Sequence, residues 1–132
     1  MSYRPATPDD AALIYRIRRE AENQPWYQPQ PTDWDNHLRW LEQRLNNPLI
    51  TLLIWEEFHH PLGVLRIDSN GELTHHAYDD NTAHRMLTAA TPYATNHGGR
   101  LKAALDTDDP RWLQFTRAGW HHYPSRTLIY RP

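Results

Sequence analysis

The 132-residue chain contains no cysteine, which excludes disulfide bonds and any site or nucleophile that depends on a thiolate. It also lacks an apolar run near the ~18–20 residues that a membrane-spanning helix needs. The opening residues, 1–5, lack the apolar core of a signal peptide. The formal charge of −2 leaves no excess of positive charge for a nucleic-acid partner. We therefore expect a cytoplasmic protein that binds neither membranes nor nucleic acid.

Several common catalytic and metal-binding signatures are missing as well. The sequence has no Gly-x-Ser-x-Gly, Gly-x-x-x-x-Gly-Lys or Gly-x-Gly-x-x-Gly motif, so hydrolase, P-loop and dinucleotide-binding functions have no support. Nine histidines are present, but the adjacent pairs at 59–60, 75–76 and 121–122 fall in a turn or in strands, where neighbouring side chains diverge. Without a His-x-His strand pair or a helical i, i+4 pair, we expect no metal site.

Aromatic residues, in contrast, are abundant. Six tryptophans and seven tyrosines occur in a chain whose length suits a single domain, residues 1–132, with one core. These side chains either fill that core or line a cleft.

Two amphipathic helices are predicted in the first half of the chain. Residues 7–10, Thr-Pro-Asp-Asp, combine an N-cap, a proline at the first helical position and acids in the first turn. The helix that follows is expected to end near Asn23. A second helix is expected after the proline-rich segment 24–31, with Thr32 as its cap and residues 46–48 as its end. Its predicted inward stripe comprises Trp34, Leu38, Leu41 and Leu45, with His37 and Trp40 beside it.

Strands are predicted before and after these helices. A short strand at 3–7 opens the chain, and 49–55, 63–68 and 73–78 form three consecutive antiparallel strands. The Asn70-Gly71 pair predicts a type I′ turn between the last two of them.

The second half continues with a helix over 81–97 that we expect to break at Thr91-Pro92, because proline removes a backbone hydrogen bond. A strand at 101–105, a helix at 111–117 and a strand pair at 121–123 and 126–130 complete the chain. The predicted order is β-α-α-β-β-β-α-β-α-β-β. It describes an α/β (α+β) fold, with a central, mostly antiparallel mixed sheet of about seven strands flanked by about four helices.

This order, together with several local segments, resembles the GNAT superfamily of acyl-CoA-dependent N-acetyltransferases over essentially the whole chain. The segments are 3–10, Pro61-Leu62-Gly63-Val64, and Phe115-Thr116-Arg117-Ala118-Gly119-Trp120. The resemblance implies acetyl-CoA as the cofactor and a primary amine of a small molecule as the acceptor, which attacks the thioester directly. The segment 37–41 after Trp26 is similar to the subgroup that acetylates nucleotide-linked amino sugars. The aromatic side chains and the habit of many relatives also suggest a homodimer.

The resemblance implies a cofactor site where the fourth and fifth strands part. The pantetheine arm would bond there to the backbone of the fourth strand, at His76, Ala77 and Tyr78. The pyrophosphate would lie on a loop of the form Arg/Gln-x-x-Gly-x-Gly/Ala. Its three defined positions fall on Tyr78, Asn81 and Ala83, and only Ala83 fits the pattern.

The start of the following helix is a second candidate for holding a phosphate. Unpaired N–H groups from Thr82 to His84 would attract an anion, but Asp79 and Asp80 lie beside them. A carboxylate about 6 Å from a phosphate charge costs roughly 2–3 kcal/mol at an effective dielectric constant near 20. Alternatively, residues 79–81 simply cap the helix.

Amine acetylation needs a base for the ammonium proton and a donor for the leaving thiolate. The resemblance places the donor, usually a tyrosine, at Phe115, which carries no proton to give, and places a frequent asparagine at Asp108. Tyr123 is a substitute candidate for the donor, on the expectation that the final strands lie near the cleft.

The candidate bases lie on the fourth predicted strand: Glu72, His75 and His76. A histidine with a pKa near its usual ~6.5 suits this work, although half-exposed strand histidines without a catalytic role are common. Strand alternation places His75 and His76 on opposite faces, so only one can face the cleft. An acceptor pocket is expected between the first two helices, from Trp26, Tyr27 and Trp34.

Two hypotheses therefore remain. One is an active N-acetyltransferase. The other is a GNAT-like domain that has lost catalysis and acts as a ligand-binding or protein-interaction module, because the loop glycine is missing, the loop is acidic and Phe115 replaces the donor.

Overall fold

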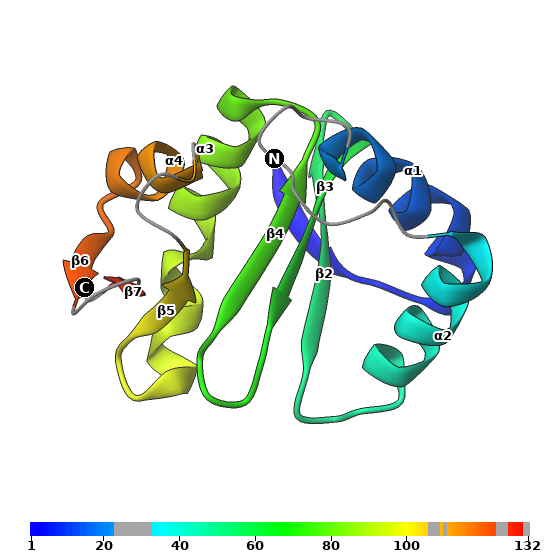
Figure 1. Cartoon of the computed structure of the whole chain (residues 1–132), viewed down its shortest axis with the longest axis horizontal. Coiled ribbons are helices and arrows are strands. Elements are labelled where there is room, and N and C mark those ends of the chain that lie inside the picture. Colours follow the sequence, from blue (N-terminus) through cyan, green and yellow to red (C-terminus); the bar gives the residue numbers. More distant parts are fainter. Residues whose placement is uncertain (23–32, 106–108, 110, 124–126, 131–132) are drawn as a thin grey trace.

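The computed structural model describes residues 1–22, 33–105, 109, 111–123 and 127–130 (Figure 1). Its elements follow the predicted order, with two short 3-10 helices, η1 and η2, added. The elements are β1 (Ser2–Pro5), η1 (Pro8–Asp10), α1 (Ala11–Glu22), α2 (Trp34–Leu45), β2 (Thr51–Glu57), β3 (His60–Ile67), β4 (Leu73–Ala77), α3 (Asp80–Ala90), η2 (Thr91–His97), β5 (Leu101–Ala104), α4 (Arg111–Arg117), β6 (His121–Tyr123) and β7 (Thr127–Tyr130).

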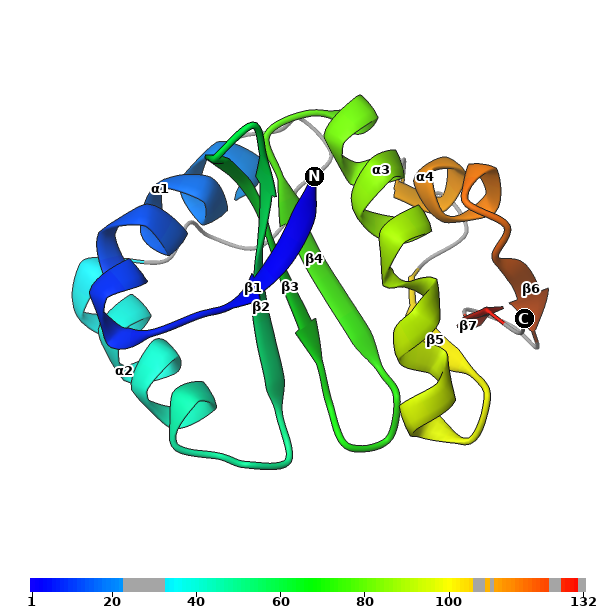
Figure 2. The ribbon, with the colours of Figure 1, turned by 180° about the vertical axis from the view of Figure 1, so that it is seen from behind.

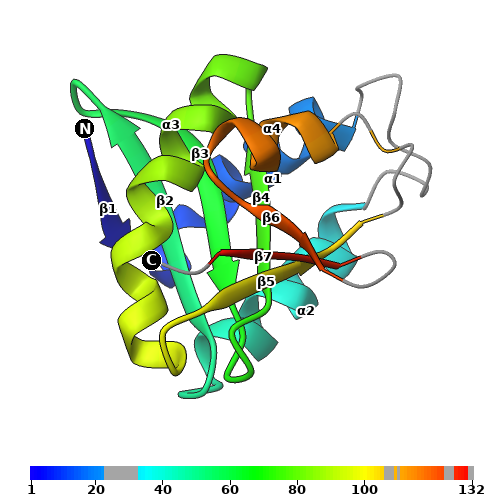
Figure 3. The ribbon, with the colours of Figure 1, turned by 90° about the vertical axis from the view of Figure 1, so that its left-hand side faces the viewer.

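The strands form two sheets instead of the single sheet that we predicted. One sheet has the order β1-β2-β3-β4 and the other β5-β7-β6, and the strand pairs within each are antiparallel. Among the described residues, β4 and β5 are joined only by a parallel bridge between Glu72 and Lys102. Figure 3 shows β5 and β7 running across the direction of β4. The two sheets therefore separate beyond this bridge.

Helices cover both faces of the first sheet, with α1 and α2 on one face and α3, joined by α4, on the other (Figures 1 and 2). Because side chains alternate along a strand, neighbouring residues enter different cores. Val64 of β3 packs with α1 and α2, whereas Leu65 packs with α3 and α4. The α1/α2 core contains Ile14, Ile17, Leu41, Leu52, Ile54 and Val64, and the α3/α4 core includes Leu65, Met86, Leu87, Phe115 and Trp120.

The hairpin turns differ from the prediction at Asn70-Gly71. The Gly71 N–H donates to Asp68 O, so Ser69 and Asn70 are the central turn residues, and Gly71 follows them with φ of 84°. The type I′ signature, two successive positive φ values, occurs instead at Phe58 (52°) and His59 (66°), which link paired residues of β2 and β3. The Asn-Gly pair thus marks the hairpin correctly but not its turn type.

The predicted break at Pro92 is confirmed, because α3 ends at Ala90 and η2 begins at Thr91. The start of α2 differs from the prediction: Asp33 is its cap and accepts the Asn36 N–H at 2.8 Å, while Thr32 lies outside the described residues.

The buried stripe of α2 also differs. His37 and Leu41 are buried, whereas Trp34 and Leu38 are exposed. The helix is therefore rotated relative to the predicted stripe, and a histidine takes a core position.

Candidate functional site

The separation of β4 from β5 leaves part of the β4 backbone without a strand partner on one side. We call this unpartnered side of β4, beyond the Glu72–Lys102 bridge, the opening. The Tyr78 N–H donates to Leu62 O at 3.3 Å, so it is directed to β3 and not to the opening. In an antiparallel pair, hydrogen-bonded and non-hydrogen-bonded residues alternate. The backbone groups of His75 and Ala77 therefore face the opening, while those of His76 face β3. Of the three residues expected to bond the pantetheine arm, Ala77 alone has backbone groups that face the opening.

The start of α3 is capped by its own aspartate. Asp79 Oδ1 accepts the Thr82 N–H at 2.7 Å, and Asp79 O accepts the Ala83 N–H at 3.0 Å. The Thr82 amide lowers the pKa of Asp79, which keeps the carboxylate charged at neutral pH. The Thr82 and Ala83 amides, which we considered for a phosphate, are thus occupied within the protein, and the His84 amide lies inside α3. The capping interpretation describes Asp79 correctly.

The side chains at this helix start divide into a buried and an exposed group. Thr82 and Ala83 are buried, whereas Asn81 and His84 are exposed. Asp79 and Asp80 are exposed as well, so an incoming ligand would meet two carboxylates beside the Asn81 amide and the His84 ring.

On the α3/α4 face, a hydrogen-bonded chain joins β4 to α3 through Gln114 of α4. Gln114 Oε1 lies 2.9 Å from His75 Nε2, and Gln114 Nε2 donates to Asp80 Oδ1 at 2.5 Å. An amide oxygen can only accept, so His75 carries its proton on Nε2. No local sequence pattern marked Gln114, and its link to β4 and α3 depends on the tertiary fold.

A second polar network flanks the same helix start. Buried Glu57 accepts from Trp55 Nε1 at 2.8 Å and pairs with Arg85 Nε at 2.6 Å. Arg85 Nη2 also donates to Thr82 Oγ1 at 3.3 Å. Arg85 and Trp55 hold the pKa of Glu57 below its usual value. With Asp79 and Asp80, the region carries more negative than positive charge.

The two candidate histidines occupy opposite faces of β4, as predicted. His75 lies on the α3/α4 face against Phe115, with ring centroids 5.2 Å apart, and burial lowers its pKa to about 4. His76 pairs with Val64 and lies on the α1/α2 face, half-buried. Burial and, next, the Arg18 guanidinium lower the pKa of His76 to about 3. Both rings are therefore neutral at pH 7, and both are weaker bases than we expected.

Phe115 is a core residue, packed edge-on against Trp120 with centroids 4.8 Å apart. Glu72 is half-buried at the closed end of the opening, where it forms the bridge to Lys102. Tyr123 belongs to β6, which pairs with β7, and β7 in turn separates β6 from β5. The structure thus places Glu72 beside the opening, and Tyr123 on the strand of that sheet farthest from β5.

One of the three predicted acceptor-pocket residues is described. Trp34 stands edge-on to Tyr15 at 5.1 Å and lies 5.6 Å from the ring of His37. Trp26, Tyr27 and Asp108 lie outside the described residues.

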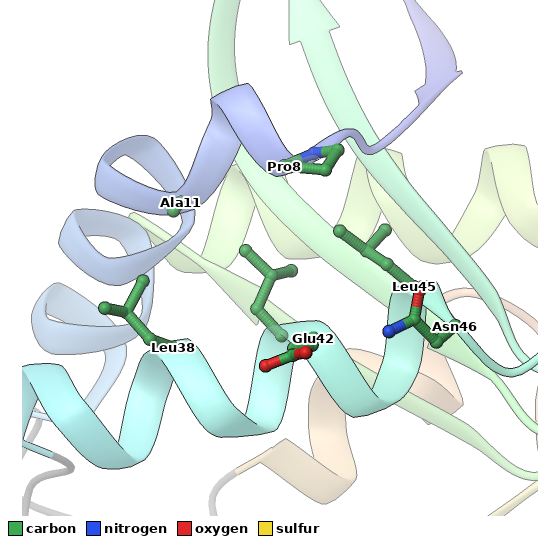
Figure 4. Close-up of a pocket in the computed structure, with 7 residues that line it drawn as sticks. Pro8, Ala11, Leu38, Glu42, Leu45 and Asn46 are labelled. Carbon is green, nitrogen blue, oxygen red and sulfur yellow. The ribbon is translucent and has the colours of Figure 1, made fainter.

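A pocket of about 250 Å³ lies elsewhere, between η1 and α2 (Figure 4). Its lining is mostly apolar: Pro8, Ala11, Leu38, Leu41, Glu42, Leu45 and Asn46. It contains none of the predicted site residues and no candidate base other than exposed Glu42, so we do not assign the chemistry to it.

Within the described part of the chain, no group of three or more His, Asp or Glu side chains is placed to bind a metal ion. The helices of that part include none with the length and apolar character that a membrane crossing requires.

Comparison with known proteins finds no matching family model and no matching curated sequence. Solved structures do match. An aminoglycoside acetyltransferase AAC(6')-Ib in complex with coenzyme A is 13% identical, with 98% of this chain and 94% of that chain covered and a TM-score of 0.79. A spermidine N-acetyltransferase SpeG chimera from Vibrio cholerae and hSSAT is 9% identical, with coverage of 98% and 94% and a TM-score of 0.76.

An acetyltransferase from Thermus thermophilus is 18% identical, with 99% of this chain and 96% of that chain covered and a TM-score of 0.76. At these identities the comparison establishes the fold. The chain has the GNAT-like fold that its element order predicted.

Proposed function

We propose that the chain is an N-acetyltransferase that transfers an acetyl group from acetyl-CoA to the primary amine of a small molecule. The observation that carries this proposal is the separation of β4 from β5, which leaves the backbone of His75 and Ala77 facing an opening. Coenzyme A complexes and amine acceptors among the structural neighbours support it. An amino sugar linked to a nucleotide stays a prediction for the acceptor.

The opening suits the thin pantetheine arm better than the helix start suits the pyrophosphate. Amide and carbonyl groups at His75 and Ala77, which have no strand partner among the described residues on this side, would provide hydrogen bonds along one side of the arm. At the start of α3, Asp79 occupies the Thr82 amide and adds a negative charge. The cofactor would supply the activated acetyl group, and we expect its affinity to be low because Asp79 and Asp80 repel its phosphates.

His76 is our candidate to accept the proton from the attacking amine. It is half-buried on the α1/α2 face, where the acceptor would approach, and it is neutral at pH 7 because its pKa is lowered. A base with such a low pKa holds the proton briefly and must pass it to solvent. We expect His76→Ala to lower kcat more than it raises the KM for acetyl-CoA, and full activity in this variant would remove His76 from the site.

Isothermal titration calorimetry with acetyl-CoA tests the proposal directly. We expect weak but measurable binding, and turnover with a member of a panel of amino sugars and other small amines. Absence of both heat and thermal stabilisation at about 1 mM acetyl-CoA, a concentration that detects even weak binding, would overturn it.

A second function is favoured by a specific observation, the buried Phe115 at the place of the thiolate donor. In this alternative the chain binds a ligand or a protein partner without catalysis. Binding of acetyl-CoA without turnover of any amine would support it, whereas rapid turnover would exclude it.

A further inference from the structure

Arginine side chains gather on the α1/α2 side of the first sheet around Trp40 of α2. The Arg18 guanidinium lies 4.2 Å from the centroid of the Trp40 ring, and that of Arg44 lies 5.5 Å from it. Arg66 of β3 projects from the same face of the sheet, because its strand partner there is Thr74, whose Oγ1 accepts from Arg66 Nη2 at 3.3 Å. We call Arg18, Arg44 and Arg66 the arginine cluster.

Positive charge exceeds negative charge around Arg44 and Arg66. Asp68 forms an ion pair with Arg66 at 3.2 Å, but among the described residues no carboxylate forms one with Arg44. Arg44 Nε is buried, and no hydrogen-bond acceptor in the described part of the chain reaches it. Burial and then the charge of Arg66 lower the pKa of Arg44, and the charge of Asp68 opposes them only in part. An unpaired buried donor beside a like charge is unfavourable unless an anion joins it.

The cluster lies next to the candidate base. Arg66 pairs with Thr74 of β4. His76 lies two residues beyond Thr74 on the same face of that strand, a step of about 7 Å along the backbone. Arg18 and Arg66 both act on His76, since their charges contribute to lowering its pKa. A small molecule of a few bonds could therefore contact His76 with one end and Arg66 and Arg44 with the other.

We propose that the acceptor is an amine that also carries an anionic group, a carboxylate or a phosphate, and that Arg44 and Arg66 bind this group while the amine lies at His76. The proposal rests on the proposed function. Guanidinium groups bind both anions through paired hydrogen bonds, and Trp40 provides an apolar surface beside them. The same charges repel acceptors with several ammonium groups, such as spermidine.

Arg44 could instead have a purely structural role, with its aliphatic part covering Trp40. Two variants separate the roles. Arg44→Gln removes one positive charge from the cluster and retains a polar side chain. Arg39→Gln is the matched control, because Arg39 lies on the exposed side of the same helix and contacts Asn36 Oδ1 at 2.6 Å.

The first experiment uses inorganic phosphate as the probe and measures thermal unfolding, which needs no enzymatic activity. Relative to chloride at equal ionic strength, phosphate at ten times its dissociation constant should raise the unfolding midpoint by about 5 °C in the natural chain. The Arg39→Gln variant should respond equally and Arg44→Gln should not. An equal response of all three proteins, or no response of the natural chain, would overturn the proposal.

The second experiment measures acetyl transfer to two matched pairs of amines, phosphoethanolamine with ethanolamine and 4-aminobutyrate with butylamine. The pairs distinguish phosphate from carboxylate. In at least one pair the anionic amine should have a kcat/KM about 10- to 100-fold higher, and Arg44→Gln should remove this preference through KM for the amine, with KM for acetyl-CoA unchanged. Equal or lower activity on the anionic amines would overturn the proposal.

If acetyl-CoA neither binds nor reacts, the proposed function fails, while the phosphate experiment still decides whether Arg44 belongs to an anion site.

Discussion

The two faces of β4 present opposite environments to adjacent residues of one strand. On the α3/α4 face, His75 is enclosed by Phe115 and Gln114, and the nearby helix start carries Asp79 and Asp80. On the other face, His76 is half-buried close to the arginine cluster. The first face is closed and bordered by negative charge, whereas the second is more open and positively charged. A one-residue step along the chain thus changes both the packing and the sign of the local charge.

The difference in charge between the two faces of β4 bears on where an anionic group would bind. Asp79 and Asp80 should repel phosphate groups at the helix start and the arginine cluster should attract them, so electrostatics favour an anionic ligand on the α1/α2 face of β4. Substitutions on the closed face should have the largest effects, because its side chains are the more tightly packed.

Phe115→Ala should destabilise the protein by about 3–5 kcal/mol, because a ring packed against His75 and Trp120 would be replaced by a cavity. Urea unfolding measures this loss. Leu113→Ala is the control on the same helix, since Leu113 is 59% exposed, and it should change stability by at most about 0.5 kcal/mol. An equal loss of unfolding free energy in Phe115→Ala and Leu113→Ala would contradict tight packing of Phe115 on the closed face.

Lowering the pH should destabilise the protein through His75. The pKa of His75 is about 4 in the folded protein and 6.5 in the unfolded chain, so the unfolded chain binds the proton first as the pH falls. The contribution of His75 to the free energy of unfolding is therefore fully present above pH 6.5, and about 3 kcal/mol of it is lost as the pH approaches 4. Denaturant unfolding at several pH values measures the decline. His75→Gln should remove this part of the decline and leave the part that His76 contributes, because the pKa of His76 is lowered as well, whereas His59→Gln at the exposed hairpin tip should leave both parts intact.

Gly63→Ala should cost about 1–3 kcal/mol, because the new Cβ would overlap Met86 Sδ and lie 3.2 Å from His76 O. Met86 belongs to the α3 side, so this substitution tests how closely that helix approaches β3. A double-mutant cycle with Met86→Ala provides the control. The added methyl group should cost much less in the Met86→Ala background, and an unchanged cost would exclude Met86 as the obstacle.

Asp79→Gly should strengthen acetyl-CoA binding about tenfold, because a carboxylate beside the phosphates is removed. Glycine is an acceptable N-cap, so stability should fall by only a few tenths of a kcal/mol. Calorimetric titration measures the affinity. Asp33→Gly removes the corresponding cap of α2, on the opposite side of the sheet, and should leave the affinity unchanged. No difference between the two variants would refute the electrostatic explanation.

The order of the elements could be predicted from the sequence because local signals defined each one. Proline at positions 8 and 92 set the start of η1 and the break after α3, and apolar, β-branched segments separated by turn signals located β2 to β4. The division into two sheets could not be predicted in this way. It depends on the direction in which β5 leaves the Glu72–Lys102 bridge, and that direction has no local signal.

Among the candidate site residues, the sequence predicted side-chain directions only where the alternation of a strand determines them. The opposite directions of His75 and His76 follow from alternation, and their place on β4 was correct. Gln114, Arg44 and Arg66 were not identified, because each contacts residues distant in the sequence. The lowered pKa of His76 was missed for the same reason, since Arg18 and burial cause it.

The departure of β5 from β4 has a consequence for isotope exchange along a single strand. The N–H groups of Thr74, His76 and Tyr78 are directed to β3, whereas those of His75 and Ala77 face the opening. Deuterium should therefore replace hydrogen rapidly at 75 and 77 and slowly at 74, 76 and 78. A molecule lodged between the strands would remove this alternation, so five consecutive amide resonances would report its arrival without any measurement of turnover.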